Sequence, residues 1–348
     1  KGHDVTVIVA AQGARGEEAS QGGVCIIKAG RLATVASAPL SLELPLALRR
    51  QRPDIAHVHV PYPLGEAANW LVGRARHTVL TYHSDVVRQR GWLRLYAPVL
   101  RRVLGAADAI LVTSPQLLRT SPYLRPVAHK CRVVPLGIDT SAFACADPER
   151  VAALRRRLGT PLLLFAGRLR YYKGLQYLLK AQAQLEDARL AVVGTGPMER
   201  EWRALADKLG VLQRTTFCGE VPDEELPTFY HAADVFVLPA CERAEAFGLV
   251  QVEAMAAGRP VVSTELGTGT SFVNQDGVTG LVVPPRDPEA LAAACRRLLD
   301  DATLRAQYGA AARERARGEF DAGIMVERLE GIYRSLSAAG RGSLRPQA

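Results

Sequence analysis

The chain of 348 residues is long enough for two domains of ordinary size, each with its own hydrophobic core. With 48% hydrophobic and 23% charged residues, the composition is typical of a soluble globular enzyme, and no apolar run approaches the ~20 residues that a membrane-spanning helix needs. The net charge of +9 is dispersed and no nucleic-acid-binding motif accompanies it, so nucleic acid is not an expected partner. An anionic membrane surface or a phosphorylated substrate fits this charge better.

The cysteines are scattered along the chain, without regular spacing and without a Cys-x-x-Cys pair. This pattern indicates free thiols in a reducing compartment, not a disulfide framework or a metal site. We therefore expect a cytoplasmic protein.

Strands and helices are predicted to alternate along the first half of the chain. The residues favour strands at 3–10, 24–29, 54–60, 78–82, 109–113 and 131–135, with a loop over the polar stretch 11–23. Helices are expected at 45–50, 64–76 and 88–104.

The second half repeats the alternation. Strands are predicted at 162–166, 190–193, 216–218, 235–238, 260–263 and 280–283, and helices at 198–209, 224–232, 249–257, 288–299 and 324–336. The pattern predicts an α/β fold of two Rossmann-like, doubly wound domains that face a cleft, with boundaries at 1–147 and 148–340. We expect the last helix to pack back toward the first domain and ligands to bind at the carboxyl ends of the strands.

The stretch 245–258 has the most informative pattern. Glu245 and Glu253 lie eight residues apart, and Phe247 and Gly248 fall in the turn before the helix expected at 249–257. A helix start exposes unpaired N–H groups that suit a phosphate, and Gly248 lets the backbone approach a ligand closely. Two glutamates at this spacing also occur on solvated helix faces, so the spacing alone is weak evidence.

Two further loops follow predicted strands. Arg168 and Lys173, in the loop 167–174, are close enough in sequence to reach one anionic group, although an exposed basic loop is the alternative. The loop 193–197 contains Gly194 and Gly196 but lacks the full Gly-x-Gly-x-x-Gly fingerprint, so by itself it is weak evidence for a nucleotide.

Taken together, these motifs resemble the retaining, GT-B-fold glycosyltransferases of family 4, also called glycosyl transferases group 1. The resemblance rests on Glu-x7-Glu with Phe-Gly after the first Glu, on Glu-Ala-Met-Ala-x-Gly-x-Pro-Val-Val at 253–262, and on Gly-Arg-Leu-x-x-x-Lys-Gly at 167–174. It covers almost the whole chain. It implies transfer of a hexosyl group from a nucleotide-diphosphate sugar to a glycan or a lipid-pyrophosphate-linked acceptor. The configuration at the anomeric carbon is expected to be retained, and no cofactor is expected.

The resemblance also implies roles for single residues. Glu245 is expected to face the donor sugar, and Glu253 to hold the ribose hydroxyls of the nucleotide. The backbone amides of Phe247, Gly248 and Leu249 are expected to meet sugar hydroxyls and phosphate. The remaining donor contacts implied are Arg168 and Lys173 on the diphosphate, Gly194 and Gly196 as lining, and Glu220 and Val221 on the nucleobase.

In the first half, His83 lies in Tyr-His-Ser-Asp at 82–85, after a predicted strand. Family members place a His there against the donor sugar, whereas we interpret His57 and His59, inside an apolar strand, as structural. The amino-acid sequences at 82–85 and 267–274 are similar to those of bacterial mannosyltransferases of surface-polysaccharide synthesis. This similarity favours GDP-mannose over UDP-hexoses as the donor.

No Asp-x-Asp follows a predicted strand, so we expect no metal; Arg168, Lys173 and the helix start would hold the diphosphate. Paired carboxylates also occur in glycoside hydrolases, but spacing in sequence does not establish their separation in space. The rival from another class is a non-catalytic nucleotide-sugar-binding protein.

The segment 88–104 has a basic stripe, with Arg90, Arg94 and Arg101 on one side of the predicted helix. The opposite side carries apolar residues. This pattern suits a helix lying on an anionic membrane, which would make the protein peripheral on the inner membrane face. The alternative is a helix that buries its apolar side in the domain core.

The first predicted strand begins within three residues of the start of the chain, without an initiator Met. In relatives a strand, a glycine-rich loop and a helix precede the equivalent strand, and the absent strand would be central in the sheet. We expect a natural protein with a further ~20–35 residues, about one strand–helix unit, and poor stability without them.

Overall fold

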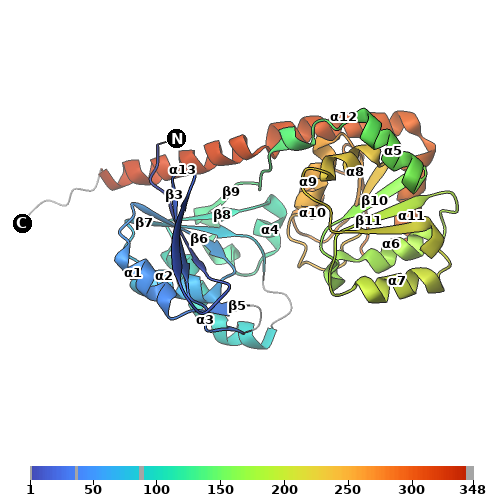
Figure 1. The fold of residues 1–348 in the computed structure, drawn as a ribbon. Helices are drawn as coiled ribbons and strands as arrows, with labels where there is room; N and C mark the ends of the chain where they lie inside the picture. The colour runs from blue at the N-terminus through green and yellow to red at the C-terminus, as the bar shows by residue number, and fades with distance from the viewer. Residues whose placement is uncertain (1, 36–37, 86–89, 342–348) are drawn as a thin grey trace, which may run out of the picture. The chain divides into compact units, whose positions relative to one another are not determined.

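The computed structural model describes residues 2–35, 38–85 and 90–341. They form two compact α/β units (Figure 1). Unit 1 contains Lys1–Thr113, Ser121–Val133 and the chain from Leu329 onward, and unit 2 contains Ser114–Thr120 and Val134–Arg328. The chain passes between the units after Thr113, Thr120, Val133 and Arg328. The domain boundaries 1–147 and 148–340 stay a prediction. The last helix, α13 (Ala322–Arg341), has residues in both units.

Unit 2 is built on a parallel sheet of six strands in the order β12-β11-β10-β13-β14-β15. The strands are β10 (Leu162–Ala166), β11 (Arg189–Val193), β12 (Thr215–Gly219), β13 (Val235–Leu238), β14 (Val261–Thr264) and β15 (Gly280–Val283). All six were predicted to within one residue at each end. Along β10, Leu162 and Leu164 enter one hydrophobic core while Leu163 and Phe165 enter another. The strands are short aliphatic runs because both faces of the sheet are buried.

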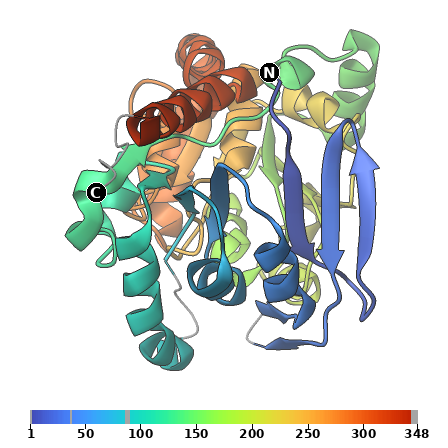
Figure 2. The same ribbon diagram turned by 90° about the vertical axis from the view of Figure 1, so that its left-hand side faces the viewer.

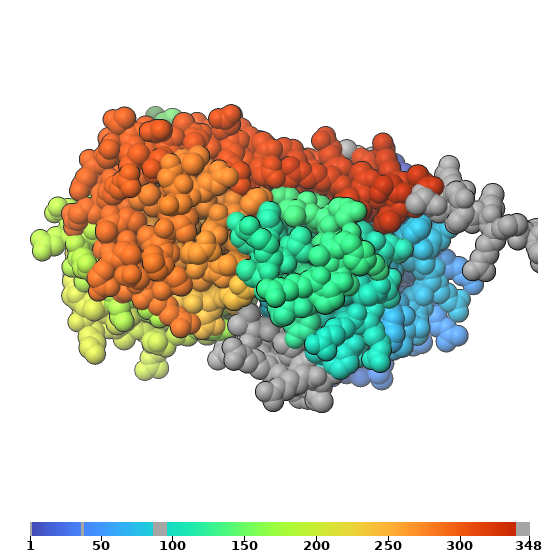
Figure 3. Space-filling model, turned by 180° about the vertical axis from the view of Figure 1, so that it is seen from behind, coloured from blue at the N-terminus to red at the C-terminus, as the bar shows by residue number. Residues whose placement is uncertain are grey.

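Helices cover both faces of this sheet, as the doubly wound prediction requires. On one face lie α5 (Pro148–Leu158), α8 (Leu226–Ala232), α9 (Leu249–Ala256) and α12 (Ala302–Glu319). On the other lie α6 (Leu175–Gln182), α7 (Glu199–Lys208) and α11 (Pro288–Asp300). The space-filling view shows α12, in orange-red, on the outside of unit 2 (Figure 3). Its Ala312 and Ala316 share a core with Met255 of α9 because small residues let the two helices approach closely.

Unit 1 holds three sheets where one doubly wound sheet was expected. In the first, β1 (Thr6–Ala10) runs parallel to β3 (Val24–Ala29), and β2 (Glu17–Gln21) runs antiparallel to β3 (Figure 2). The second pairs β4 (Ala33–Val35) with β5 (Ala38–Leu40). The third is a parallel sheet of β6 (Ile55–Val60), β7 (His77–Tyr82), β8 (Ala109–Val112) and β9 (Cys131–Val133). Both β1 and β6 are therefore edge strands.

The predicted loop at 11–23 was wrong, because it contains β2. The strand turns into β3 through Gly22 and Gly23, whose φ angles of 58° and 82° suit a tight hairpin turn. Every residue of β2 is exposed, so the strand has no buried apolar face. Sequence periodicity could not reveal it for that reason.

The helices of unit 1 are α1 (Glu43–Arg50), α2 (Pro63–Val72) and α3 (Arg90–Ala106), and α4 (Pro115–Thr120) belongs to unit 2. The predicted helix at 64–76 ends earlier, at Val72, followed by Gly73 with extended backbone. Within the described ranges, no helix combines the length and the apolar character needed to cross a membrane.

Candidate active site

The predicted donor residues of unit 2 all follow the carboxyl ends of four neighbouring strands. Glu220 and Val221 follow β12, Gly194 and Gly196 follow β11, Arg168 and Lys173 follow β10, and Glu245, Phe247, Gly248 and Leu249 follow β13. Glu253 lies one turn into α9. We call this set the strand-end cluster. Its position is the edge at which parallel α/β sheets bind ligands.

The glycines after β11 allow two loops to pack backbone against backbone. A Cβ on Gly194 would lie 2.3 Å from the carbonyl oxygen of Gly167, and one on Gly196 would lie 2.5 Å from that of Leu169. The N–H of Leu169 donates to the carbonyl of Thr195 at 2.9 Å. The short Gly-x-Gly sequence is therefore required by the approach of these loops, whatever it contacts in a ligand.

Lys173 and Glu245 form a buried ion pair. The Nζ of Lys173 lies 2.7 Å from Oε2 of Glu245, and the two side chains are only 10% and 8% exposed. Despite this short distance, Glu245 Oε2 accepts no geometrically satisfactory hydrogen bond among the described residues. The contact is thus mainly electrostatic and leaves the carboxylate able to accept from another donor.

The turn before α9 offers backbone donors. Gly248 has a φ of 79°, and a Cβ there would lie 2.6 Å from Nε2 of Gln251. Among the described residues, the N–H groups of Phe247 and Gly248 donate to no acceptor. The Phe247 ring is buried edge-on against Phe320, so only its backbone is available to a ligand. This arrangement suits a phosphate or a hydroxyl group.

The segment 267–274 supports this turn. Thr268 donates through Oγ1 to the carbonyl of Glu245 at 2.8 Å, and the N–H of Gly269 donates to the carbonyl of Ala246 at 2.7 Å. Asn274 in turn donates through Nδ2 to the carbonyls of β14 and β15. Sequence analysis used this segment only for its resemblance to mannosyltransferases and missed its role in holding the turn before α9.

Glu253 is held by a residue that sequence analysis missed. The hydroxyl of Tyr230, on α8, donates to Oε2 of Glu253 at 2.5 Å. Burial raises the pKa of Glu253, while the hydrogen bond from Tyr230 and the charge of Lys173 lower it. No sequence signal marks Tyr230, because it stands in an apolar helix and resembles any core aromatic residue.

Two predicted residues are not fixed by contacts. Arg168 is exposed and takes part in no ion pair or hydrogen bond among the described side chains. Glu220 is also exposed, whereas Val221 packs on the core beneath the cluster. Arg168 is therefore free to bind an anion at the strand ends.

His83 lies in unit 1, in a stack of three histidines. Its Nε2 lies 2.8 Å from Nδ1 of His59, and the rings are parallel to within 12° with centroids 5.1 Å apart. His57 stacks on His59 in turn and bonds to Tyr333 of α13. Burial, with the neighbouring imidazoles, lowers the pKa values of His57 and His83 to about 4, so both are neutral near pH 7. Sequence analysis separated His83 from the two strand histidines, whereas the structure brings all three together.

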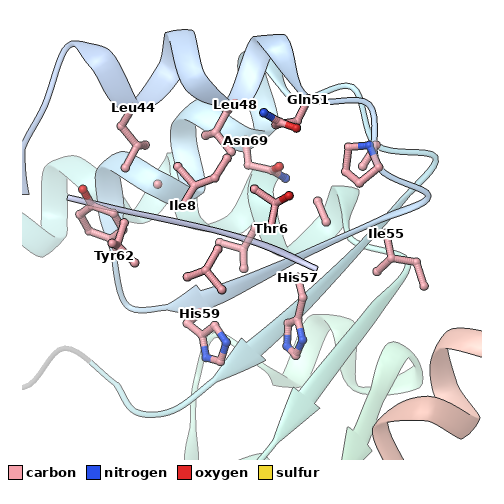
Figure 4. Close-up of a pocket in the computed structure, with 18 of the residues that line it drawn as sticks. Thr6, Ile8, Leu44, Leu48, Gln51, Ile55, His57, His59, Tyr62 and Asn69 are labelled. Carbon is pink, nitrogen blue, oxygen red and sulfur yellow. The ribbon is translucent and has the colours of Figure 1, made fainter. Parts of the chain in front are cut away.

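A cavity of about 2290 Å³ lies within unit 1 (Figure 4). Every residue of β1 and β6 lines it, although successive side chains of a strand point to opposite faces. The cavity therefore runs along the open edges of both strands, with Leu44 and Leu48 of α1 above it. No residue of the strand-end cluster lines this cavity. The expected central strand, which would neighbour β1, stays a prediction.

The basic helix is only partly described. The side chains of Arg90 and Arg94 lie outside the described residues. In the described part, Leu100 and Val103 are buried and Arg101 is exposed. The apolar side of this part of α3 thus packs in the core of unit 1, which favours the structural alternative for these residues.

Comparison with known proteins gives matches over both halves of the chain. Residues 1–142 match the family described as Glycosyltransferase Family 4, and residues 147–315 match Glycosyl transferases group 1. The chain is 39% identical over 269 residues to D-rhamnosyltransferase WbpZ of Pseudomonas aeruginosa, covering 77% of this chain and 70% of that protein. It is 36% identical over 311 residues to O-antigen chain mannosyltransferase C of Escherichia coli, covering 88% and 82%.

Among solved structures, sucrose-phosphate synthase from Thermosynechococcus elongatus superposes with a TM-score of 0.80 at 27% identity, over 97% of this chain and 90% of that one. Both halves of the chain thus match the two halves of one enzyme class in sequence and in fold. The protein belongs to the glycosyltransferases of family 4, the glycosyl transferases group 1, and has the GT-B fold.

Proposed function

We propose that this glycosyltransferase moves a hexosyl group from a nucleotide-diphosphate sugar, held by unit 2, to a glycan or a lipid-pyrophosphate-linked acceptor. The observation that carries the proposal is the buried Lys173–Glu245 pair at the strand ends of unit 2. A donor bound there would meet a cation, a carboxylate and the unpaired N–H groups of Phe247 and Gly248. These groups match a diphosphate and the sugar attached to it.

The chemistry follows from the charge that develops during transfer. As the bond between sugar and diphosphate breaks, negative charge accumulates on the leaving phosphate. Arg168, Lys173 and the turn amides would stabilise that charge without reorganisation, and so would supply what a metal supplies in other transferases. We infer from the family resemblance that the anomeric configuration is retained, with the diphosphate leaving and the acceptor hydroxyl attacking on the same face of the sugar. The leaving phosphate oxygen then takes the proton of the acceptor hydroxyl, so the step needs no enzymic nucleophile.

The donor we propose is GDP-mannose. This choice of donor is supported by the amino-acid sequences at 82–85 and 267–274, and by the similarity of the chain to an O-antigen mannosyltransferase and a D-rhamnosyltransferase. A UDP-hexose is the alternative donor. For the acceptor, the same similarity favours a growing surface polysaccharide.

A membrane-borne acceptor would place the protein at the cytoplasmic membrane surface. The net charge of +9 and the exposed Arg101 support contact with anionic lipid. Vesicle flotation tests this part of the proposal. We expect binding to anionic liposomes that is lost when Arg90, Arg94 and Arg101 are replaced by Glu, and binding that survives these changes would rule out this surface.

The main test is a donor screen by thermal shift, followed by turnover with labelled donor and lipid-pyrophosphate acceptors. We expect GDP-mannose or a UDP-hexose to raise the melting temperature, and label to appear in the acceptor. Donor binding without transfer to any acceptor would favour the rival function, a non-catalytic nucleotide-sugar-binding protein. Absence of binding by every nucleotide sugar would contradict both functions.

A further inference from the structure

We propose that Tyr230 is a positioning residue, which orients the carboxylate of Glu253 toward the ribose of the donor nucleotide. The inference rests on the proposed function, because it needs a nucleotide in unit 2. It assigns to a buried residue of α8 a part in distinguishing a ribonucleotide from a deoxyribonucleotide.

The hydrogen bond fixes one oxygen of Glu253 and leaves the other free. Tyr230 donates to Oε2 at 2.5 Å, while Oε1 accepts from no described residue. Glu253 itself is partly exposed, whereas Tyr230 is fully buried. An ionised carboxylate only accepts hydrogen bonds, so the free oxygen suits a hydroxyl that donates, as a ribose hydroxyl can.

The phenol ring is itself held rigidly. Phe143 packs on it at a centroid distance of 5.6 Å and an interplanar angle of 80°, and Phe236 of β13 packs on it at 5.6 Å and 50°. Rotation of the ring would disrupt both contacts within a dense core. The Tyr230 hydroxyl therefore has a defined position, and its hydrogen bond restricts the rotation of the Glu253 carboxylate.

The simpler interpretation is that Glu253 only satisfies a buried hydroxyl, as buried tyrosines generally need a partner. Two observations favour positioning. The carboxylate is kept in a site where burial disfavours its charge, and the Tyr230 hydrogen bond is the largest of the effects that oppose this burial. The shared hydrogen bond also joins α8 to α9, the helix that begins after the turn at Phe247 and Gly248.

Tyr230→Phe tests the proposal, because it removes the hydroxyl and keeps the ring. The probes are UDP and GDP, each compared with its 2′-deoxy and 3′-deoxy form by calorimetry. For the wild-type protein we expect tighter binding of the ribonucleotide. In Tyr230→Phe the ratio of ribo to deoxy affinity should fall about ten-fold, as expected for loss of a hydrogen bond to a charged group.

The matched control is Tyr308→Phe, which removes a buried hydroxyl from the other core of unit 2. It should leave the ratio unchanged. A structural role of Tyr230 would lower stability or weaken all nucleotides alike, but would not move the ratio. An unchanged ratio in Tyr230→Phe, with ribonucleotide still preferred by the wild type, would overturn the inference and leave the proposed function standing.

A second variant covers a loss of folding in Tyr230→Phe. Glu253→Leu should lower the same ratio, because it removes both carboxylate oxygens and leaves no acceptor for a ribose hydroxyl. Adding Tyr230→Phe to Glu253→Leu should then change the ratio no further. Retention of the wild-type ratio in Glu253→Leu would overturn the inference as well. If the wild type binds none of these nucleotides, the proposed function fails and the inference fails with it.

Discussion

The ion pair between Lys173 and Glu245 leads to a sharp prediction about stability. Lys173→Met keeps an unbranched side chain that fills the space of the lysine stem, but removes the ammonium group 2.7 Å from the Glu245 carboxylate. Both side chains are at most 10% exposed, so water cannot replace the lost cation without a rearrangement. The variant would therefore leave a carboxylate buried without its counter-ion.

Breaking a buried pair from one side costs ~3–5 kcal/mol. Because both side chains keep slight contact with solvent, we expect a loss near the lower end, about 3 kcal/mol, in the free energy of unfolding of unit 2. The double variant Lys173→Met/Glu245→Gln removes both charges and should recover more than half of the loss. As a control, Arg203→Met breaks a surface pair with Glu199, whose side chains are 46% and 28% exposed, and should cost only about 0.5 kcal/mol.

Urea unfolding followed by tryptophan fluorescence measures these differences. Trp202 is fully buried in unit 2 and reports on it alone when Trp70 and Trp92 are replaced by Phe. A loss below about 1 kcal/mol in Lys173→Met would refute the reasoning, since it would show that water reaches the carboxylate without its counter-ion. Strictly additive losses in the double variant would refute it equally, because they would mean that the two groups do not interact.

Three other predictions follow from the described residues. Arg168→Ala should lower turnover by ~10²–10³ if Arg168 binds the leaving diphosphate as proposed. The unfolding transition should stay unchanged, because the side chain is exposed. Arg168→Lys should also lose much of the rate, and near wild-type activity in either variant would place the donor elsewhere. The pKa values of His57 and His83 lie at about 4 in the folded state, against about 6.5 in the unfolded chain. Between these pH values the unfolded chain binds more protons than the folded one. Unit 1 should therefore lose stability as the pH falls from about 6.5 to 4. This decline in the urea midpoint should shrink in His57→Asn, and an equal decline in both proteins would contradict the assignment. Finally, the open edges of β1 and β6 should make unit 1 less stable than unit 2. The backbone amides of β1 and β6 should therefore exchange hydrogen faster than those of β10. A single cooperative unfolding transition with uniform exchange would show that the open edges do not lower the stability of unit 1.

Local sequence was sufficient for the elements whose pattern is set by short-range physics. Each strand of the unit 2 sheet is a short aliphatic run, and both of its faces are buried, so composition alone identified it. The turn at Phe247 and Gly248 was also predictable, because a positive φ favours glycine and because Leu249–Ala256 are good helix formers. Parallel strands bring their carboxyl ends to one edge, so the placement of Arg168, Lys173 and Glu245 at that edge followed from the predicted parallel sheet.

Contacts between residues distant in sequence were decided only by the tertiary structure. The bond of Tyr230 to Glu253 depends on how α8 packs against α9, and the stack of His59 on His83 depends on the register of β6 with β7. Neither Tyr230 nor His59 carries a local sequence signal for these contacts. A tyrosine in an apolar helix has the same sequence pattern whether or not a carboxylate lies opposite, and a histidine in an apolar strand has the same pattern whether or not an imidazole lies opposite. The strand β2 escaped for a related reason: its pairing with β3 comes from a glycine turn and backbone hydrogen bonds, which leave no periodic pattern in side chains that are all exposed.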